Sequence, residues 1–413
     1  MHNTSLILNR INIGFIAALV GFTSSVALIY QAAVNLGTDL AMVSSWIFAL
    51  GLGMGVTSIG LSLYYRMPIL IAWSTPGAAL LITNTQGFTI NQTIGAFIVS
   101  ACLITLSGLT GWFEKMINKV PQQIASAMLA GLLLSFGLDV FNLMQQQLLL
   151  VFTMLIIYLI CKKIIPQFAM LAILVVGTTL AWQQGLFVIP ALEWSISQLI
   201  YIEPEWHLSA AINIGIPLFL ITMVTQNIPG IAILHANQYR PAVSKIMTIT
   251  GLMNMVIAPF GGFAINLAAL TAAICMTPEA SPNPNKRYWA AVSTGGFYLL
   301  MGIGALSLMS LFQSLPQALI LALAGIALFS TIGSSLQHAF IETKYKEAAL
   351  MTFLVTASDF SLWNIGSALW GMLAGIITVA ISHFVSKARE KTRQIPSLNC
   401  GKTKPATRLK MIQ

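Results

Sequence analysis

Apolar positions dominate the chain in long runs, most of about 17–25 residues, which are separated by short polar turns. A run of this length crosses the roughly 30 Å hydrocarbon core of a bilayer as one α-helix, whereas a membrane β-barrel has shorter segments of alternating polarity. The pattern therefore predicts an all-α polytopic membrane protein. The expected spans are residues 11–34, 42–63, 67–84, 93–112, 121–141, 147–161, 165–187, 212–236, 242–258, 259–277, 289–310, 317–338, 347–360 and 362–385.

The basic residues alternate between the loops that join these spans. All 20 Lys and Arg lie in the N-terminal segment, the even-numbered loops or the C-terminal tail, and Lys162 and Lys163 belong to the sixth loop. The odd-numbered loops contain none, although the longest carries Glu193, Glu203 and Glu205. Because cytoplasmic loops are enriched in Lys and Arg, both termini are predicted to be cytoplasmic, and one span more or fewer would break the alternation.

Composition narrows the class of protein further. Only 8% of the residues are charged, against roughly 25% in a soluble chain. The net charge of +9 comes from short loops and a polar tail, so it indicates membrane topology and contact with membrane lipids, and no nucleic acid. The four cysteines stand singly, and no catalytic or phosphate-binding motif is present. The sequence thus predicts no enzyme, no cofactor and no metal site, and it leaves open whether the protein is a monomer or a homodimer.

The chain also repeats itself. The sixth and thirteenth spans are both unusually short, and the third and tenth are both interrupted by turn-forming residues. Seven spans is an odd number, so the second half enters the membrane inverted, which is typical of secondary transporters. We expect a first repeat at residues 1–187, an extracytoplasmic linker at 188–211, a second repeat at 212–385 and a basic cytoplasmic tail at 386–413.

The interruption of the third span lies in "PILIAWSTPGAALLIT", residues 68–83. Pro76 suits the first turn of a helix, and Ser74 or Thr75 suits its N-cap, after an extended segment at 69–73. In the tenth span we expect a half-helix from Leu267, capped by Asn266, after an extended segment at 263–265. Two helix N-termini that face each other present free N–H groups and partial positive charge, so a small anion fits between them.

Trp73 and Phe263 are expected to form apolar walls for a planar substrate. Three consecutive polar residues in the middle of the eighth span, Thr225, Gln226 and Asn227, are expected to bind it through hydrogen bonds. The alternatives are a proline-kinked third span, a hairpin loop in the tenth, and polar residues that only join helices. On the twelfth span, a polar stripe either lines the cavity or packs, and it consists of Ser330, Thr331, Ser334, Ser335 and Gln337. The substrate-binding candidates are Trp73, Ser74, Thr75, Pro76, Gly77, Gln226, Asn227, Phe263, Ala264, Ile265, Asn266 and Leu267.

Ionisable residues are rare within the spans, and coupling to an ion gradient is expected in the absence of a phosphate-binding loop. Few hard oxygen ligands are available for sodium, so a proton is favoured. Asp139, near the outer end of the fifth span, is the proton-coupling candidate. The alternative is a solvated carboxylate at a helix end, which is also our interpretation of Asp359.

Four long segments resemble the benzoate/proton symporter family (benzoate membrane transport protein): "PILIAWSTPGAALL", "TQNIPGIAILHANQYRP", "GLMNMVIAPFGGFAINLAALTAAICM" and "GSALWGMLAGI". This family is similar to uracil permeases and anion exchangers. The resemblance implies a 7+7 inverted repeat, with a core domain from spans 1–4 and 8–11 and a gate domain from spans 5–7 and 12–14. It also implies short strands before the half-helices, and import of an aromatic carboxylate with a proton.

One departure from the uracil-type relatives bears on the substrate. Those proteins place a carboxylate on span 8 and another on span 10, where this chain has Gln226 and the region 266–268. The absence of acidic groups suits an anionic substrate, which two buried carboxylates would repel. The alternatives are a nucleobase or inorganic-anion permease of the same fold, and a channel or sensor that does not transport.

Overall fold

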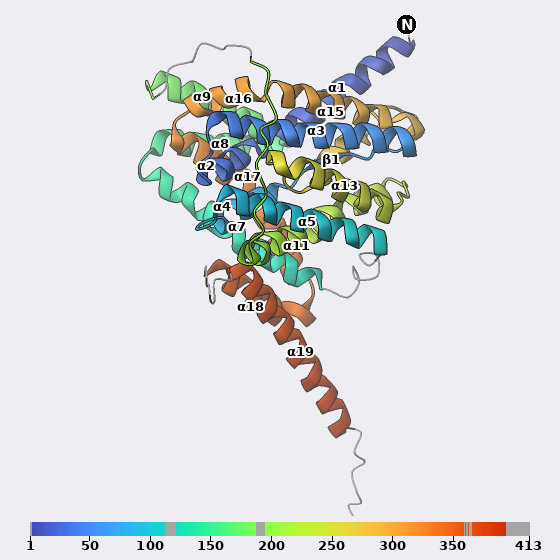
Figure 1. The fold of residues 1–413 in the computed structure, drawn as a ribbon, viewed down its shortest axis with the longest axis vertical. Helices are drawn as coiled ribbons and strands as arrows, with labels where there is room; N and C mark the ends of the chain where they lie inside the picture. The colour runs from blue at the N-terminus through green and yellow to red at the C-terminus, as the bar shows by residue number, and fades with distance from the viewer. Residues whose placement is uncertain are drawn as a thin grey trace, which may run out of the picture.

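The computed structural model describes residues 2–111, 121–186, 195–358, 360, 362 and 366–393, and they are mostly helical (Figure 1). The first half contains α1 (His2–Thr23), α2 (Val26–Asn35), α3 (Leu40–Tyr65), β1 (Ile71–Trp73), α4 (Thr75–Asn84), α5 (Ile90–Thr110), α7 (Gln122–Met144), α8 (Leu148–Ile164) and α9 (Ala169–Gln183). The second half contains α10 (Leu208–Ala210), α11 (Ile216–Ile221), α12 (Ile228–Ala236), α13 (Val243–Ile257), β2 (Ile265–Leu267), α14 (Leu270–Cys275), α15 (Tyr288–Ile303), α16 (Ala305–Ser314), α17 (Gln317–Phe340), α18 (Lys346–Ala357) and α19 (Ser367–Arg393). Two π-helical turns, Ala211–Gly215 and Thr222–Asn227, join α10, α11 and α12 into one continuous segment.

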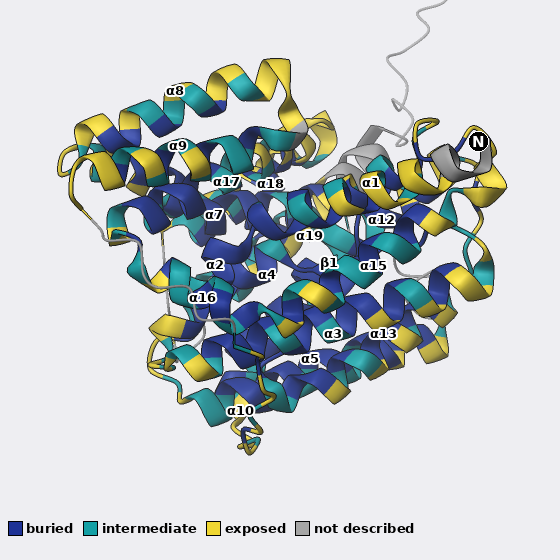
Figure 2. Ribbon diagram, turned by 90° about the horizontal axis from the view of Figure 1, so that it is seen from above, coloured by how far each residue is buried: buried dark blue, intermediate teal, exposed yellow. Residues whose placement is uncertain are grey.

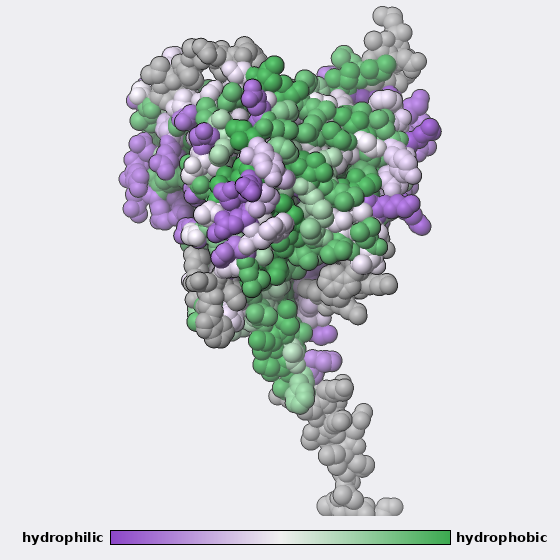
Figure 3. All heavy atoms as spheres, in the orientation of Figure 1, coloured by the Kyte–Doolittle hydropathy of each residue, from purple (hydrophilic) through white to green (hydrophobic). Residues whose placement is uncertain are grey.

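The structure is that of a multi-pass membrane protein. In the described part of the chain, 8 helices are long and apolar enough to cross a membrane, or 9 if the pair bent by 63° at Gly304 is one span. α8, α9 and α18 have only 17, 15 and 12 residues. Apolar residues cover the middle of the face in Figure 3, and hydrophilic residues gather toward its left and right margins. The count of fourteen spans and the inverted repeat stay predictions.

The helices pack in two groups (Figure 2). In the larger group, α3 packs against α13, α15 and α16, and α5 packs against α13. In the smaller group, α7 packs against α17, α18 and α19, and α8 packs against α9 and α17. The larger group comprises α1–α5, β1, β2 and α10–α16, and the smaller group comprises α7–α9 and α17–α19. The groups meet where α2 contacts α17 and where α4 contacts α7.

Small residues allow the helices of the larger group to approach closely. A Cβ added at Gly51 of α3 would lie 2.7 Å from the Tyr298 carbonyl oxygen, and one at Gly55 would lie 2.8 Å from the Gly295 carbonyl oxygen of α15. Such backbone-to-backbone contact is how membrane helices gain packing energy, since lipid offers them no hydrophobic driving force. The close contact between α3 and α15 therefore depends on glycines spaced one turn apart.

The two strands lie side by side in the interior. β1 and β2 pair antiparallel, with Ile71 opposite Leu267 and Trp73 opposite Ile265. β1 is shorter than the predicted segment 69–73, and β2 lies two residues later than the predicted segment 263–265. This shift follows from the register, because Ile265, Asn266 and Leu267 are the residues that lie opposite β1.

Side chains satisfy the outer edges of this small sheet. Ser58 of α3 accepts a hydrogen bond from the Ile71 N–H at 2.9 Å and donates to the Ile71 carbonyl at 3.3 Å. Asn254 of α13 does the same for Ile265, at 2.7 Å to its N–H and 3.0 Å to its carbonyl. Asn227 accepts from the Leu267 N–H at 2.9 Å. Non-helical backbone persists at membrane depth only when protein groups satisfy it in this way.

An extended segment, residues 195–207, crosses the larger group and is visible as the green trace down the middle of Figure 1. The Ile200 N–H donates to Ser45 of α3 at 2.9 Å, and the Leu306 N–H of α16 donates to Ser197 at 2.7 Å. The Glu205 N–H donates to the Asn91 carbonyl of α5 at 3.0 Å. The segment thus ties three elements of the larger group together.

Candidate functional site

α4 begins inside the protein, directly after β1. Ser74 has an extended backbone and accepts a hydrogen bond from the Gly77 N–H at 3.0 Å, and Pro76 occupies the first turn. The Ser74 N–H donates to the Ala264 carbonyl at 3.0 Å, which fixes the start of α4 beside the second strand. The predicted helix start near Pro76, with Ser74 as N-cap, is confirmed. Among the described residues, no acceptor pairs with the Thr75 N–H.

The second break differs from the prediction. α14 begins at Leu270, not near Leu267, and Asn266 lies in β2 rather than at a helix cap, so that interpretation of Asn266 was wrong. The physical reason is the pairing of Asn266 with Ala72, which keeps its backbone extended. Its side-chain amide donates to the Ala264 carbonyl at 3.2 Å. Ala264 itself has φ 25°, a conformation that costs free energy in any residue with a Cβ.

The turn between β2 and α14 leaves backbone donors unpaired. The Ala268 N–H donates to the Leu70 carbonyl at 2.9 Å, and this bond continues the strand pairing. In the described part of the chain, the N–H groups of Ala269, Leu270 and Thr271 have no acceptor. Thr271 is buried, Ala269 is half-buried and Leu270 is exposed, and the unpaired amides of the first two have a free-energy incentive to bind an acceptor from a solute.

These breaks open into a cavity of about 470 Å³ between the two helix groups, here called the central cavity. Its volume lies in the usual range for small-molecule sites. The larger group contributes Val20, Gly21, Ser24, Ser25, Ala72, Trp73, Thr75, Pro76, Gln226, Ala268, Ala269, Leu270, Thr271 and Ile274, and the smaller group contributes Tyr158, Lys162, Pro166, Ala169, Met170, Ala327, Ser330 and Thr331. This lining contains one cation and no carboxylate.

The structure brings four of the predicted site residues to the cavity and places the others behind it. Trp73, Thr75, Pro76 and Gln226 line it. The predicted residues outside the lining are Ser74, Gly77, Asn227, Phe263, Ala264, Ile265, Asn266 and Leu267. They lie at the two breaks, except Asn227, which is on the eighth span and binds β2.

Of the two aromatic side chains expected to form the cavity walls, only Trp73 lines the cavity. Phe263 is fully buried in a cluster with Trp46 and Phe97, at ring-centroid distances of 6.3 and 5.9 Å, and does not line the cavity. Trp73 packs instead against Phe22 of α1, at 5.6 Å between ring centroids. The indole is therefore held by α1, and Trp73 is only 4% exposed.

Gln226 and Asn227 are neighbours in sequence but have different roles. Successive residues of a helix point about 100° apart, so both side chains cannot face the same space. Gln226 is half-buried and lines the central cavity, whereas Asn227 is buried and binds β2 through the Leu267 N–H. Its amide also donates to the Met223 sulfur at 3.2 Å. Asn227 is thus a structural tether.

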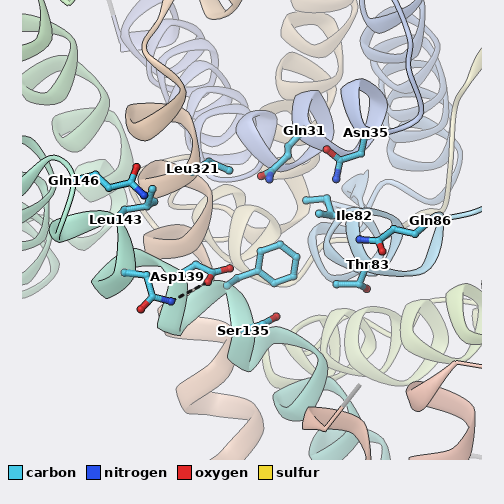
Figure 4. A pocket seen from close by; sticks show the side chains of 12 residues that line it. Gln31, Asn35, Ile82, Thr83, Gln86, Ser135, Asp139, Leu143, Gln146 and Leu321 are labelled. Carbon is cyan, nitrogen blue, oxygen red and sulfur yellow. Dashed lines mark hydrogen bonds between the residues drawn. The ribbon is translucent and has the colours of Figure 1, made fainter. Parts of the chain in front are cut away.

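Asp139 lies in a second cavity, of about 380 Å³, here called the Asp139 cavity (Figure 4). It is exposed and accepts a hydrogen bond from Asn142 at 3.3 Å. The lining is Gln31, Asn35, Ile82, Thr83, Gln86, Ser135, Phe136, Asp139, Asn142, Leu143, Gln146 and Leu321. Thr75 and Pro76 at the start of α4 line the central cavity, and Ile82 and Thr83 near its end line this one. The two cavities therefore lie at opposite ends of α4.

Tyr158 and Lys162 are lining residues that the sequence did not single out. Both lie on α8, four residues apart and hence on one face of the helix. The charge alternation assigned Lys162 to a cytoplasmic loop, because a sequence fixes the depth of a residue better than the direction of its side chain. The i, i+4 spacing of Tyr and Lys was the only available signal.

Two groups of helices around a small-molecule cavity, in a polytopic chain, are typical of a membrane transporter. Comparison with known families specifies it further: residues 5–381 match the family "Benzoate membrane transport protein". The chain belongs to this family, whose members are transporters and not enzymes, as the sequence predicted.

Two curated relatives are similar over most of their length. The chain is 43% identical to Inner membrane protein YdcO of Escherichia coli (strain K12), over 90% of this chain and 95% of that protein. It is 36% identical to Benzoate membrane transport protein of Acinetobacter baylyi (strain ATCC 33305 / BD413 / ADP1), over 89% of this chain and 93% of that protein. The protein is thus a multi-pass membrane protein of a bacterial transporter family.

Solved structures of anion transporters share the fold. SLC26A9 superposes with a TM-score of 0.63 at 12% identity, over 91% of this chain and 66% of that chain, so this protein spans about two thirds of its length. The transmembrane domain of the cyanobacterial bicarbonate transporter BicA gives a TM-score of 0.58 at 12% identity, over 90% of this chain and 97% of that domain. At such low identity the likeness establishes the architecture alone.

Proposed function

We propose that this protein imports an aromatic carboxylate such as benzoate, together with a proton, across the bacterial cytoplasmic membrane. The observation that carries the proposal is the central cavity, which combines an aromatic side chain, unpaired backbone N–H groups and no acidic residue. Membership of the benzoate transport family supports the substrate class. The family relative from Acinetobacter is itself named for benzoate.

The two ends of an aromatic acid have separate partners in this cavity. The aromatic ring of the substrate would pack against the indole of Trp73. Stacked or edge-to-face aromatic pairs contribute about 0.5–1.5 kcal/mol beyond their buried area. The carboxylate would accept hydrogen bonds from the N–H groups of Thr75, Ala269 and Leu270. Hydrogen bonds to a charged group contribute about 1.5–3 kcal/mol each. Gln226 adds an amide from the eighth span. With no carboxylate in the lining, an anion meets no like charge.

Movement of the substrate follows from the two helix groups. We take the larger group as the core domain and the smaller group as the gate domain, which correspond to the division expected from the resemblance. The central cavity lies between them, so a rigid-body displacement of one against the other opens it to one side or the other. In this scheme, both termini are cytoplasmic.

Asp139 is our candidate for the proton-carrying group. Its cavity lies at the opposite end of α4 from the central cavity, and Asp139 is the titratable residue in the described lining. A carboxylate in this position can take up a proton on one side of the barrier and release it after the conformational change. Asp139→Asn is therefore expected to abolish accumulation driven by a pH gradient but to retain exchange of labelled for unlabelled substrate. Loss of both activities, or retention of both, would remove Asp139 from this role.

Accumulation tests the proposed function directly. Proteoliposomes that contain the full chain receive an imposed pH gradient, acidic outside, and labelled benzoate. A proton symporter concentrates benzoate inside above its external concentration and loses this ability when a protonophore collapses the gradient. A channel only equilibrates the label, and protein-free liposomes correct for passive entry of benzoic acid. Accumulation of uracil or sulfate in place of benzoate would refute the proposed substrate class.

A further inference from the structure

A lysine and a tyrosine of the smaller helix group line the central cavity together. Lys162 and Tyr158 of α8 both line it, and the Lys162 Nζ donates a hydrogen bond to the Tyr158 hydroxyl at 2.9 Å. The Nζ lies 5.1 Å from the centroid of the Tyr158 ring, on the side of the hydroxyl group. Tyr158 is buried and Lys162 is exposed, so the tyrosine anchors the ammonium group at the edge of the cavity.

The pair has unused donors. An ammonium group carries three N–H bonds, and Tyr158 accepts one of them. Because the tyrosine oxygen acts as the acceptor, its own O–H hydrogen is free to donate elsewhere. No carboxylate of the protein lies in the described lining to neutralise the charge. Lys162 is therefore a cation at the edge of a cavity that has room for a solute and whose described lining holds no counter-charge.

We infer that Lys162, positioned by Tyr158, is the ionic partner of the substrate carboxylate on the gate side of the site. This inference rests on the proposed function. A carboxylate has two oxygens and about four acceptor sites. Backbone N–H groups of the larger group can take one oxygen while Lys162 of the smaller group takes the other. The bound anion then joins the two groups, which a neutral analogue of the same ring cannot do.

The test compares a charged and a neutral ligand on the full-length protein in nanodiscs. Equilibrium binding of labelled benzoate and of labelled benzamide is measured for the wild type, Lys162→Met, Lys162→Arg, Tyr158→Phe and Lys163→Met. Lys163→Met is the matched control, because it removes the same charge one residue away. Lys163 is exposed and does not line the cavity. This control also corrects for any effect of a lost basic residue on membrane insertion.

For Lys162→Met we expect benzoate affinity to fall about 10- to 100-fold, the range for one charge-assisted hydrogen bond at 1.4 kcal/mol per tenfold. Benzamide affinity changes less than threefold, so the benzoate-to-benzamide ratio falls. Lys162→Arg restores most of the benzoate affinity, Tyr158→Phe gives a smaller loss, and Lys163→Met behaves like the wild type.

The two ways of failing are distinct. If the wild type binds benzoate and Lys162→Met binds it equally well, the inference is wrong and the proposed function stands. An equal loss for benzoate and benzamide, or for Lys162→Met and Lys163→Met, also overturns it, because the effect is then on folding or insertion. If the wild type binds no benzoate, the proposed function itself fails and the inference fails with it.

Discussion

The edge of β2 provides a test of how this protein tolerates non-helical backbone in its interior. Asn254 of α13 accepts from the Ile265 N–H and donates to the Ile265 carbonyl, and both residues are at most 2% exposed. Replacing Asn254 with Leu keeps a branched side chain of similar size but removes both hydrogen bonds. Any loss of stability then reflects unsatisfied polar groups more than an empty space.

The expected loss of stability follows from the two backbone groups of Ile265 that lose a hydrogen-bond partner. A buried donor or acceptor left unpaired costs about 1–3 kcal/mol, so Asn254→Leu is expected to lower the free energy of unfolding by about 2–6 kcal/mol. Ser58→Ala, at the edge of β1, leaves Ile71 in the same situation. We expect Ser58→Ala to lower the free energy of unfolding by less than Asn254→Leu, because the hydrogen bond from Ser58 to the Ile71 carbonyl is longer, at 3.3 Å.

The assay is chemical unfolding in mixed micelles, followed by far-ultraviolet circular dichroism. Asn237→Leu is the control, since Asn237 makes one hydrogen bond to the Ile233 carbonyl at the half-buried end of α12, where water can replace it. We expect that control to lose less than about 1 kcal/mol. If Asn254→Leu unfolds at the same denaturant concentration as the wild type, side-chain satisfaction of the strand edge does not stabilise the fold.

Three further predictions concern the site and its supports. Ser74→Ala removes the N-cap of α4 and should lower stability by about 0.5–2 kcal/mol in the same unfolding assay, whereas Ser74→Thr should retain most of it. Gln226→Ala should weaken benzoate binding about tenfold in equilibrium binding without changing the unfolding midpoint, since its side chain has a solute-accessible amide. Gly261→Ala should prevent accumulation of folded protein, measured by size-exclusion chromatography, because Gly261 has φ 85° and an added Cβ would overlap the Trp46 ring. A monodisperse Gly261→Ala protein, an unaltered Gln226→Ala affinity or an unaltered Ser74→Ala midpoint would each contradict the corresponding argument.

Local signals in the sequence were sufficient for the first break but not for the second. Ser74, Pro76 and Gly77 lie within four residues, and an N-cap depends only on such near neighbours, so the start of α4 was predictable. Asn266 carries an equally good cap residue type, yet its conformation depends on pairing with Ala72, which is distant in the chain. Competition between a local cap and a long-range strand pair cannot be resolved from one segment alone.

The direction of side chains was the second feature that could not be predicted from the sequence. The apolar pattern gives the depth of each residue, and this was enough for the polytopic class and for the polar positions of the eighth span. It does not say which face of a helix meets the cavity. Phe263 was therefore expected in the wall that Trp73 and Phe22 form, and Lys162 was assigned to a loop although it reaches the cavity.

The placement of two cavities at the two ends of α4 has an electrical consequence. α4 has 10 residues and is therefore about 15 Å long, roughly half the thickness of the hydrocarbon core. If water fills the two cavities from opposite sides of the membrane, each bulk potential extends inward and most of the transmembrane voltage falls across this thin layer of protein. A lone benzoate anion crossing it would do work against nearly the full resting voltage. In the proposed symport, a benzoate and a proton would cross it together without net charge, so the voltage would neither drive nor oppose them.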